Sequence, residues 1–424
     1  MQEFVVARAE AGGRFDKYLK RLLPLASSGF LYKMLRKKNI TLNDKKAEGK
    51  EILAEKDVVK LFFSEETFLK FTGRSESVSI SGRDRADEGN KDSVKKSPKD
   101  CLKAYQQLGE IPVIYEDEDI LILNKPAGAL SQKAKKEDVS LNEWMIGYLL
   151  KKEEITGEEL SRFCPSVCNR LDRNTSGLLL CGKTLRGSRF LSEVLRDRSL
   201  HKYYLTYAEG KIEYPITLRG YLKKEAEKNR SKVISEEVYR KRVLTAEPER
   251  NQKKVLVAEP ERNQEKVLTE KPERNQKKVL TAEPGESQKR VLTAGAEGYR
   301  KKASAPTGGE KEHPKEYHRI ETVIKPLFYS EGMDCTKLEI LLVTGKSHQI
   351  RAHLSEIGHP VLGDIKYGWK PKRKEEMGLK HQLLHAYRVE FPKREGEFAY
   401  LSGKAVTAPL PELFEKLEKR FMGR

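Results

Sequence analysis

Hydrophobic residues at helical spacing dominate the first part of the chain. Apolar side chains recur every three or four positions between residues 14 and 23, and a second such group covers residues 31–35. Two short helices are predicted there. A strand-like segment at residues 40–43, a polar turn and a β-type run at 58–62 follow. We therefore expect residues 1–63 to form a small αβ domain.

The pattern changes at residue 64. Residues 64–109 are poor in apolar side chains and rich in serine, glycine and charge, which is typical of a flexible linker. Strand and helix patterns return in residues 110–424. The expected strands cover residues 113–115, 120–123, 178–180 and 203–205, and the expected helices cover 141–150 and about 185–195. This mixture predicts an α+β domain with much sheet.

A 12-residue repeat interrupts this second domain. Its approximate unit is KVLTAEPERNQK, and the Val-Leu pair recurs at 243–244, 255–256, 267–268, 279–280 and 291–292. Each unit brings only two apolar residues, together with a proline that would break a continuous helix. So little apolar surface cannot offset the entropy of ordering the chain. We therefore expect residues of about 236–314 to be a disordered or extended insertion rather than a packed array.

The chain is strongly basic. Of its 424 residues, 83 are Lys or Arg and 64 are Asp or Glu, which gives a formal net charge of +19. Such an excess indicates a polyanionic partner, although excess lysine can also serve only to prevent aggregation. Within the first two predicted helices a basic stripe suits contacts with phosphate, because only one acid, Asp16, accompanies it. The basic stripe consists of Arg14, Lys17, Lys20, Arg21, Lys33, Arg36, Lys37 and Lys38.

The cysteines and the lengths of the apolar runs indicate in which cellular compartment the protein is expected. Five cysteines, an odd number, are spread over a long chain, which favours reduced thiols and the cytosol. Cys164 and Cys168 have no second Cys or His pair at zinc-site spacing, so we expect no metal site and interpret both as buried thiols. No stretch approaches about 18 consecutive apolar residues, and the amino terminus lacks a signal-peptide pattern. Neither a membrane span nor secretion by a signal peptide is expected.

Three segments of the first domain, RFDKYLKRLLP, LYKMLRKKNITLNDKKA and EGKEILAEKDVVKLFF, resemble the small RNA-binding domain named after the fourth protein of the small ribosomal subunit. The resemblance covers roughly residues 12–63 and includes a tight turn that displays Asn-Asp-Lys. A basic amphipathic helix pair is also what a solvated surface looks like. If the resemblance holds, the RNA-binding residues in this domain are Arg14, Lys17, Lys33, Arg36, Lys37, Lys38 and Asn43.

A polar turn with one carboxylate precedes an apolar strand at residues 168–180, where the sequence is CNRLDRNTSGLLL. Catalytic groups often lie in such loops, although an Asp between two arginines is more often a paired surface residue. The turn resembles the R-L-D-x-x-T-S-G signature of the RluA-type pseudouridine synthases, in which the aspartate is catalytic. The resemblance implies that Asp172 is the catalytic residue and makes Arg170 a candidate RNA contact.

Further segments match that family in the expected order. They are IYEDEDILILNKPAG at 114–128, Lys202-Tyr203-Tyr204, TGKSHQIRAHLSEIGHPVLGDIKYG at 344–368 and LLHAYRVEFP at 383–392. By this resemblance, Tyr204 and Arg351 are the active-site tyrosine and arginine. The implied fold class is α+β: a pseudouridine synthase fold with a central mixed, mainly antiparallel sheet, preceded by the small αβ RNA-binding domain. The insertion then splits one catalytic domain.

The chemistry implied by the resemblance requires no cofactor and no metal, because the uracil is cleaved from its ribose, turned and rejoined through carbon. Asp172 would act as a nucleophile or as a proton acceptor, and the choice stays open. Arg351 is expected to hold the carboxylate through a two-point hydrogen bond. Tyr204 is expected to stack on the uracil or relay a proton; the alternative is an ordinary core tyrosine. The target nucleotide should be extruded from its helix.

Several positions qualify this interpretation. Asn169 stands where the family often has His, but no proton transfer in the implied chemistry requires that His. Thr-Gly-Lys-Ser at 344–347 resembles the end of a phosphate-binding loop, yet Ile340 occupies the position of the required Gly, which disfavours nucleotide hydrolysis. His348 and His353 are interpreted as structural or phosphate-facing, since no third metal ligand is evident.

The expected function is an RNA pseudouridine synthase acting on large-subunit (23S) ribosomal RNA, because large-subunit enzymes of that family commonly carry the amino-terminal domain. Two alternatives stay open: the same chemistry on transfer RNA, and a non-catalytic RNA-binding or ribosome-assembly factor with this fold. We expect a cytoplasmic monomer whose partner is RNA, with no membrane or metal partner.

Overall fold

The computed structural model describes residues 1–72, 97–225, 230–245, 317–370, 379 and 381–421. Contacts divide the chain into two units, residues 1–239 with 316–424, and residues 240–315. Most of the expected insertion at about 236–314 lies outside the described residues, but its start forms helix α8 (Glu236–Thr245) instead of extended chain. Within the described ranges, no helix is long and apolar enough to cross a membrane.

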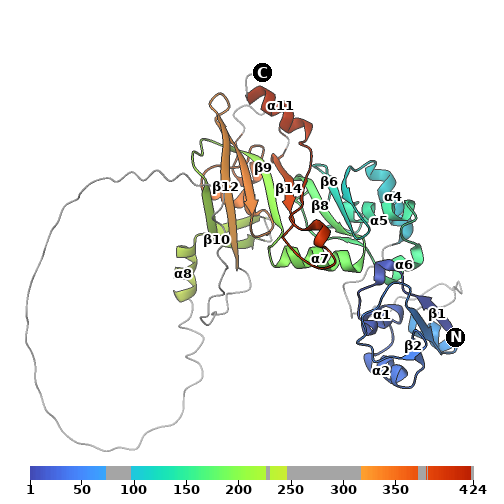
Figure 1. The fold of residues 1–424 in the computed structure, drawn as a ribbon. Helices are drawn as coiled ribbons and strands as arrows, with labels where there is room; N and C mark the ends of the chain where they lie inside the picture. The colour runs from blue at the N-terminus through green and yellow to red at the C-terminus, as the bar shows by residue number, and fades with distance from the viewer. Residues whose placement is uncertain (73–96, 226–229, 246–316, 371–378, 380, 422–424) are drawn as a thin grey trace, which may run out of the picture. The chain divides into compact units, whose positions relative to one another are not determined.

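Residues 1–72 form a four-stranded sheet with its own helices and its own hydrophobic core (Figure 1). The sheet order is β1-β4-β2-β3, and all neighbours are antiparallel. The elements are β1 (Gln2–Val5), η1 (Arg8–Glu10), α1 (Phe15–Leu22), α2 (Ser28–Arg36), β2 (Ile40–Leu42), β3 (Lys45–Lys46), β4 (Val58–Leu61) and α3 (Glu65–Thr72). Both predicted helices are confirmed. Their apolar residues, such as Phe15, Leu19 and Leu31, form the core, because tertiary packing rather than intrinsic propensity stabilises helices this short.

The expected Asn-Asp-Lys turn joins β2 to β3. Asn43 and Asp44 have φ angles of 51° and 62°, the left-handed values required by a two-residue type I′ hairpin. The Asn43 amide donates to Oδ1 of Asp57 at 2.8 Å and accepts a hydrogen bond from the Val58 N–H at 2.8 Å. Asn43 therefore holds the turn through contacts inside the domain.

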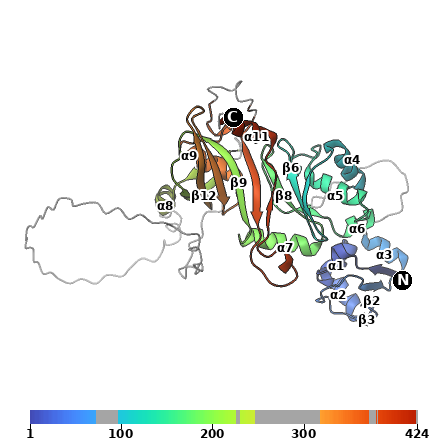
Figure 2. The same cartoon turned by 45° about the horizontal axis from the view of Figure 1, so that its top comes forward.

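A large mixed sheet occupies the rest of the described chain (Figures 1 and 2). Its order is β11-β10-β12-β13-β9-β14-β8-β6-β5, with β15 paired to β14 and β7 to β8. Every pairing is antiparallel except β14 with β8. The strands are β5 (Val113–Glu116), β6 (Ile120–Lys125), β7 (Ser166–Val167), β8 (Ser176–Gly182), β9 (His201–Glu209), β10 (Ile216–Glu225), β11 (Arg230–Ile234), β12 (Tyr317–Ser330), β13 (Cys335–Leu342), β14 (Leu384–Glu390) and β15 (Ala405–Thr407). The predicted α+β class with a central, mainly antiparallel sheet is confirmed.

Helices pack beside this sheet, and α4 and α5 lie side by side (Figure 2). They are α4 (Pro98–Leu108), α5 (Leu141–Lys151), α6 (Gly157–Arg162), α7 (Leu185–Arg196), α9 (Gln349–Glu356) and α11 (Glu412–Phe421), with 3-10 turns η2 (Ile365–Tyr367) and η3 (Ala399–Leu401). Because α3 and α4 fall inside residues 64–109, the prediction of a flexible linker was wrong for those stretches. Buried apolar residues such as Cys101 and Ala104 explain why α4 is ordered despite its polar surroundings in sequence.

Strands β6 and β8 lie between two hydrophobic cores. Leu121 and Leu123 of β6 face the core that contains α5, whereas Ile120 and Ile122 face the core that contains α7. Alternate residues of a strand point to opposite faces, so burial on both faces accounts for the unbroken apolar run in the sequence. Because β8 is paired with β6 and buried on both faces, the position of the turn that precedes β8 is fixed.

Cys164 and Cys168 flank the short strand β7 near the surface. Cys164 is exposed and Cys168 is half-buried. Our interpretation of both as buried thiols was therefore wrong, because the lack of metal partners in the sequence does not show whether a cysteine is covered.

Candidate active site

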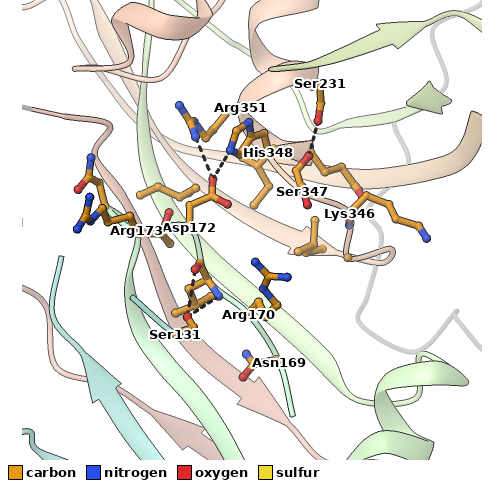
Figure 3. Close-up of a pocket in the computed structure, with 18 of the residues that line it drawn as sticks. Ser131, Asn169, Arg170, Asp172, Arg173, Ser231, Lys346, Ser347, His348 and Arg351 are labelled. Carbon is orange, nitrogen blue, oxygen red and sulfur yellow. Dashed lines mark hydrogen bonds and ion pairs between the residues drawn. The ribbon is translucent and has the colours of Figure 1, made fainter. Parts of the chain in front are cut away.

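A pocket of about 680 Å³ lies where the turn before β8, strand β9 and helix α9 meet (Figure 3). Asp172 of the turn, Tyr204 of β9 and Arg351 of α9 all line it. Tyr204 is paired with Ile340 of β13 and Ala386 of β14, and α9 follows β13 in the chain. The sheet order thus brings together three residues that are distant in sequence. The volume is usual for a site that binds one small ligand or nucleotide.

The turn that carries Asp172 is held on both sides. The Ser131 hydroxyl donates to the Leu171 carbonyl and accepts a hydrogen bond from the Leu171 N–H, both at 3.1 Å. On the other side, the Lys125 ammonium donates to the Arg173 carbonyl at 2.8 Å. These contacts fix the backbone on either side of Asp172 and so place its side chain at the pocket.

Lys125 is fully buried at the end of β6. Besides Arg173, it donates to the Pro126 carbonyl at 3.0 Å. Burial lowers its pKa to about 7, and the charge of Asp172 acts in the opposite direction. Lys125 belongs to the Asn-Lys-Pro-Ala-Gly segment that resembled the family, a signal that could have identified it, but the motif alone gave it no role.

Arg351 joins two carboxylates. Its Nη1 donates to Oδ2 of Asp172 at 3.0 Å, while Nε and Nη2 donate to Oδ2 and Oδ1 of Asp364 at 2.6 and 2.9 Å. The two-point contact is therefore with Asp364, and our expectation of a two-point contact with Asp172 was wrong. Burial lowers the pKa of Arg351, but the hydrogen bonds and charge of Asp364 outweigh burial and raise it above the ordinary value. Arg351 is a permanent cation in the wall of the pocket.

His348 also approaches Asp172, with 3.8 Å between its Nε2 and Oδ2 of the carboxylate (Figure 3). Its Nδ1 is hydrogen-bonded to the Tyr367 hydroxyl at 2.9 Å. The His348 backbone, with φ 58° and ψ 17°, is left-handed, which is uncommon for a residue other than glycine and aims the ring into the pocket. Burial lowers the pKa of His348, opposed by the charge of Asp172. The ring is therefore neutral near pH 7.

Tyr204 is a core residue that also reaches the pocket. It packs with Leu338 and Ile340 in a hydrophobic core and is 6% exposed, yet it also lines the pocket. Burial, together with the nearby charge of Asp172, raises the pKa of the Tyr204 hydroxyl. The group stays protonated at neutral pH and can donate a hydrogen bond.

Exposed basic side chains surround this acidic centre. Arg170, the candidate RNA contact, lines the pocket, and Figure 3 also shows Arg173 and Lys346 there. Lys224 and Lys366 line the pocket as well. Such a surface attracts a polyanion and can bind several of its phosphates.

Two polar residues near the site have structural contacts. The Asn169 amide donates to the Leu178 carbonyl at 3.3 Å and accepts from the Leu180 N–H at 2.8 Å, so it aligns the turn with β8. His353 is buried, and its Nδ1 is hydrogen-bonded to the Thr322 hydroxyl at 2.8 Å. Burial lowers the pKa of His353 to about 4, which supports the structural reading. Among the described residues, no group of three or more His, Cys, Asp or Glu could hold a metal.

The residues assigned to RNA binding in the first domain are not among those that line the pocket. All are exposed: Arg14, Lys17, Lys33, Arg36, Lys37, Lys38 and Asn43. Arg36 is the last residue of helix α2, and Lys37 and Lys38 follow it. Arg14 is paired with Asp16 at 2.9 Å. The cationic side chains form a surface suited to phosphate, whereas Asn43 is engaged in its own turn.

The site combines a carboxylate with a permanent cation, an aromatic ring and a basic rim, an arrangement that can act on one nucleotide of a polyanion. The family model described as RNA pseudouridylate synthase matches residues 119–356, more than half of the chain. The chain belongs to this family, and the expected RluA-type membership is confirmed. It is an isomerase that converts uridine to pseudouridine in RNA, so a non-catalytic binding protein is not favoured.

Relatives match nearly the whole chain. An uncharacterized RNA pseudouridine synthase of Mycoplasma genitalium is 23% identical over 397 residues, 93% of this chain and 90% of its own. Ribosomal large subunit pseudouridine synthase C of Rickettsia bellii is 25% identical over 421 residues, 97% of this chain and 99% of its own. The solved structure of human RNA pseudouridylate synthase domain containing 4 is 15% identical, has a TM-score of 0.46, and covers 77% of this chain and 97% of its own.

Proposed function

We propose that this enzyme modifies a uridine of large-subunit ribosomal RNA and that Asp172 is its catalytic carboxylate. The observation that carries the catalytic assignment is the hydrogen bond of 3.0 Å between Asp172 and the buried cation Arg351 inside the pocket. The choice of RNA is supported by the Rickettsia bellii relative, which is named for the large ribosomal subunit.

The proposed reaction is an isomerisation in which nothing is gained or lost overall. The bond between N1 of uracil and carbon 1 of the ribose breaks, and a bond between carbon 5 of uracil and that ribose carbon forms. The proton displaced from carbon 5 leaves, and N1 takes up a proton. Asp172 takes part as a nucleophile or as a proton acceptor. Tyr204 supplies a ring for stacking and a protonated hydroxyl, and Arg351 keeps Asp172 in place. The reacting nucleotide has to be extruded from its helix, since a stacked base cannot reach the pocket.

We further propose that residues 1–63 are an RNA-binding domain of the ribosomal-protein-S-four type, followed by the catalytic domain from residue 110 onward. The exposed cations of the basic stripe support this proposal, because they can contact phosphates without reading the base sequence. Asn43 is proposed to shape the turn rather than to bind RNA directly. The enzyme is proposed to work in the cytoplasm as a monomer, without a cofactor or metal.

Substituting Asp172→Asn tests the catalytic assignment. Asn keeps the size of Asp but cannot be the anionic nucleophile or base. We expect no release of tritium under single-turnover conditions from unmodified 23S ribosomal RNA that carries tritium at carbon 5 of uridine. RNA affinity in a filter-binding titration at fixed salt should stay normal. Asp197→Asn, an exposed turn residue outside the pocket lining, is the control. Normal turnover by Asp172→Asn would refute the assignment.

Mapping pseudouridine across total RNA, with and without the gene, tests the choice of RNA. We expect the sites that disappear to lie in large-subunit ribosomal RNA. Their restoration by the wild-type chain, but not by Asp172→Asn, would tie those sites to this pocket. Loss of pseudouridine from transfer RNA alone would contradict the ribosomal assignment but would still agree with the proposed reaction.

A further inference from the structure

We propose that Asp364 is a positioning residue for this reaction: it fixes the guanidinium of Arg351 so that Nη1 meets Asp172. The inference rests on the proposed role of Asp172. Asp364 does not line the pocket; the recognised segment 344–368 contains it but gave it no role, and the family match ends at residue 356. Its role is to act through Arg351 rather than to touch the nucleotide.

The first observation is the division of the donors of Arg351. Nε and Nη2 are both engaged by Asp364, and Nη1 is directed to Asp172. The side chains of Arg351 and Asp364 are 6% and 1% exposed, whereas that of Asp172 is 25% exposed. A two-point contact fixes the plane of a guanidinium, so the buried Asp364 sets the direction in which Nη1 points. The more exposed carboxylate, Asp172, is the one left to meet substrate.

The second observation is that Asp364 lies in a rigid turn. Its N–H donates to the Val361 carbonyl at 3.0 Å, and its carbonyl accepts from the Tyr367 and Trp369 N–H groups at 3.0 and 3.2 Å. The preceding Gly363 has φ 82°, and a Cβ atom there would lie 2.3 Å from the His381 carbonyl oxygen. Only glycine fits at that position, so the backbone that delivers Asp364 has little freedom.

The same turn also restrains the face of the guanidinium. The ring centre of Tyr367 lies 4.8 Å from Cζ of Arg351, and its hydroxyl accepts a hydrogen bond from the Ser231 N–H at 2.8 Å. Arg351 is thus held by Asp364 at one edge and by an aromatic ring on its face. The remaining contact, with Asp172, is a single hydrogen bond to Oδ2. No other described residue provides a hydrogen bond to Arg351 that could replace Asp364.

Asp364→Asn is the decisive variant. Asn can accept one hydrogen bond from Arg351 but cannot engage Nε and Nη2 together as a charged pair. A displacement of about 1 Å in a catalytic group can reduce a rate by about 100-fold, so we expect the single-turnover rate constant to fall ~10- to 100-fold, with unchanged RNA affinity. Combined with Arg351→Lys, the two losses should be much less than multiplicative, because both act through one contact.

The control is Asp119→Asn. Asp119 is also a buried aspartate that pairs with an arginine, Arg186, but neither residue lines the pocket. This variant should be less stable, but its folded fraction should keep the wild-type single-turnover rate constant. If Asp364→Asn is not recovered as folded protein, Asp364→Glu keeps the charge but displaces it, and should lower the rate constant at normal affinity.

The outcomes separate the two proposals. An inactive Asp172→Asn together with a normal rate constant in Asp364→Asn or Asp364→Glu would overturn only the role of Asp364. Fully multiplicative losses in the double variant with Arg351→Lys would also overturn it. A normal rate constant in Asp172→Asn would instead remove the proposed function on which the inference rests.

Discussion

The Ser131 hydroxyl exchanges two hydrogen bonds with Leu171, a residue 40 positions away, and so serves both backbone groups of the residue before Asp172. One small side chain therefore anchors the turn that carries the proposed catalytic carboxylate.

Ser131→Ala should lower both stability and turnover. It leaves the buried N–H and carbonyl of Leu171 without their partner, a loss of about 1–3 kcal/mol, and it frees the turn to move. Thermal unfolding and single-turnover tritium release measure the two effects. Ser161→Ala, which removes an exposed hydroxyl bonded to the Glu158 carbonyl, should change neither. A Ser131→Ala enzyme that is destabilised but turns over normally would show that the anchor serves folding alone.

Lys125 should make stability depend on pH. Burial lowers its pKa from 10.5 to about 7 in the folded chain, so between about pH 7 and pH 10 the unfolded chain binds the proton more tightly. The free energy of unfolding should therefore rise with pH across this window, by at most about 1.4 kcal/mol per pH unit. The destabilisation that comes from burying the charged Lys125 should be largest below about pH 7. Urea unfolding at several pH values should show a flatter profile for Lys125→Met than for the wild type.

Two comparisons make the pH prediction specific. Lys103→Met removes an exposed lysine and should leave the rise with pH unchanged. Parallel profiles for Lys125→Met and the wild type would mean that Lys125 keeps its ordinary titration when folded.

Arg351→Lys should reduce the single-turnover rate ~10- to 100-fold without weakening RNA binding. Lysine keeps one positive charge but lacks the planar fork that reaches Asp172 and Asp364 at once. Arg186→Lys, which alters a pair with Asp119 outside the pocket lining, is the matched control and should turn over normally. Wild-type turnover by Arg351→Lys would mean that a point charge is sufficient near Asp172.

Replacing four cations of the basic stripe by glutamine should weaken RNA binding and reduce its dependence on salt. Each lost phosphate contact lowers the slope of log affinity against log salt by about one. Filter binding over a series of salt concentrations measures this slope. The four cations are Lys33, Arg36, Lys37 and Lys38. Lys70→Gln, an exposed cation on α3, is the control. An unchanged slope would contradict an RNA-binding role for this surface.

Deleting residues 246–314 and joining the ends with a short glycine-serine connector should leave an active enzyme. The repeats bring few core-forming residues, and loop length has a weak effect on stability. The deletion has to begin after α8, because Tyr239 is buried and stacks on Tyr221 with 3.7 Å between ring centres. A large drop in the melting temperature would show that the repeats pack after all.

Much of the site could be predicted because its chemistry lies in short local motifs. Asp172, Tyr204 and Arg351 each belong to a segment of distinctive residue order, and the structure gathers all three in one pocket. Asp364 and Lys125 lie inside segments that were recognised as well. Their roles were missed because a motif shows residue types and spacing but not which buried group pairs with which.

The errors have a related physical origin. The partner of Arg351 depends on a competition between two carboxylates, of which Asp364 is the more buried. Helix α4 has a polar composition, but contacts with α5 bury one side of it, and such tertiary contacts override local composition. The periodicity of apolar residues predicts local helices and strands, whereas contacts between distant segments determine which polar segments become ordered.

The place of β14 in the sheet has a consequence for how the enzyme is made. Strands β8 and β9 follow one another in the chain but are not neighbours, because β14 lies between them. During synthesis, β8, which follows the Asp172 turn, and β9, which carries Tyr204, cannot be joined into one sheet until β14 (residues 384–390) has left the ribosome. Contacts between such distant segments form slowly and leave strand edges exposed in the meantime. The nascent chain should therefore depend on chaperone protection of β8 and β9, and catalytic competence should arise in one late step.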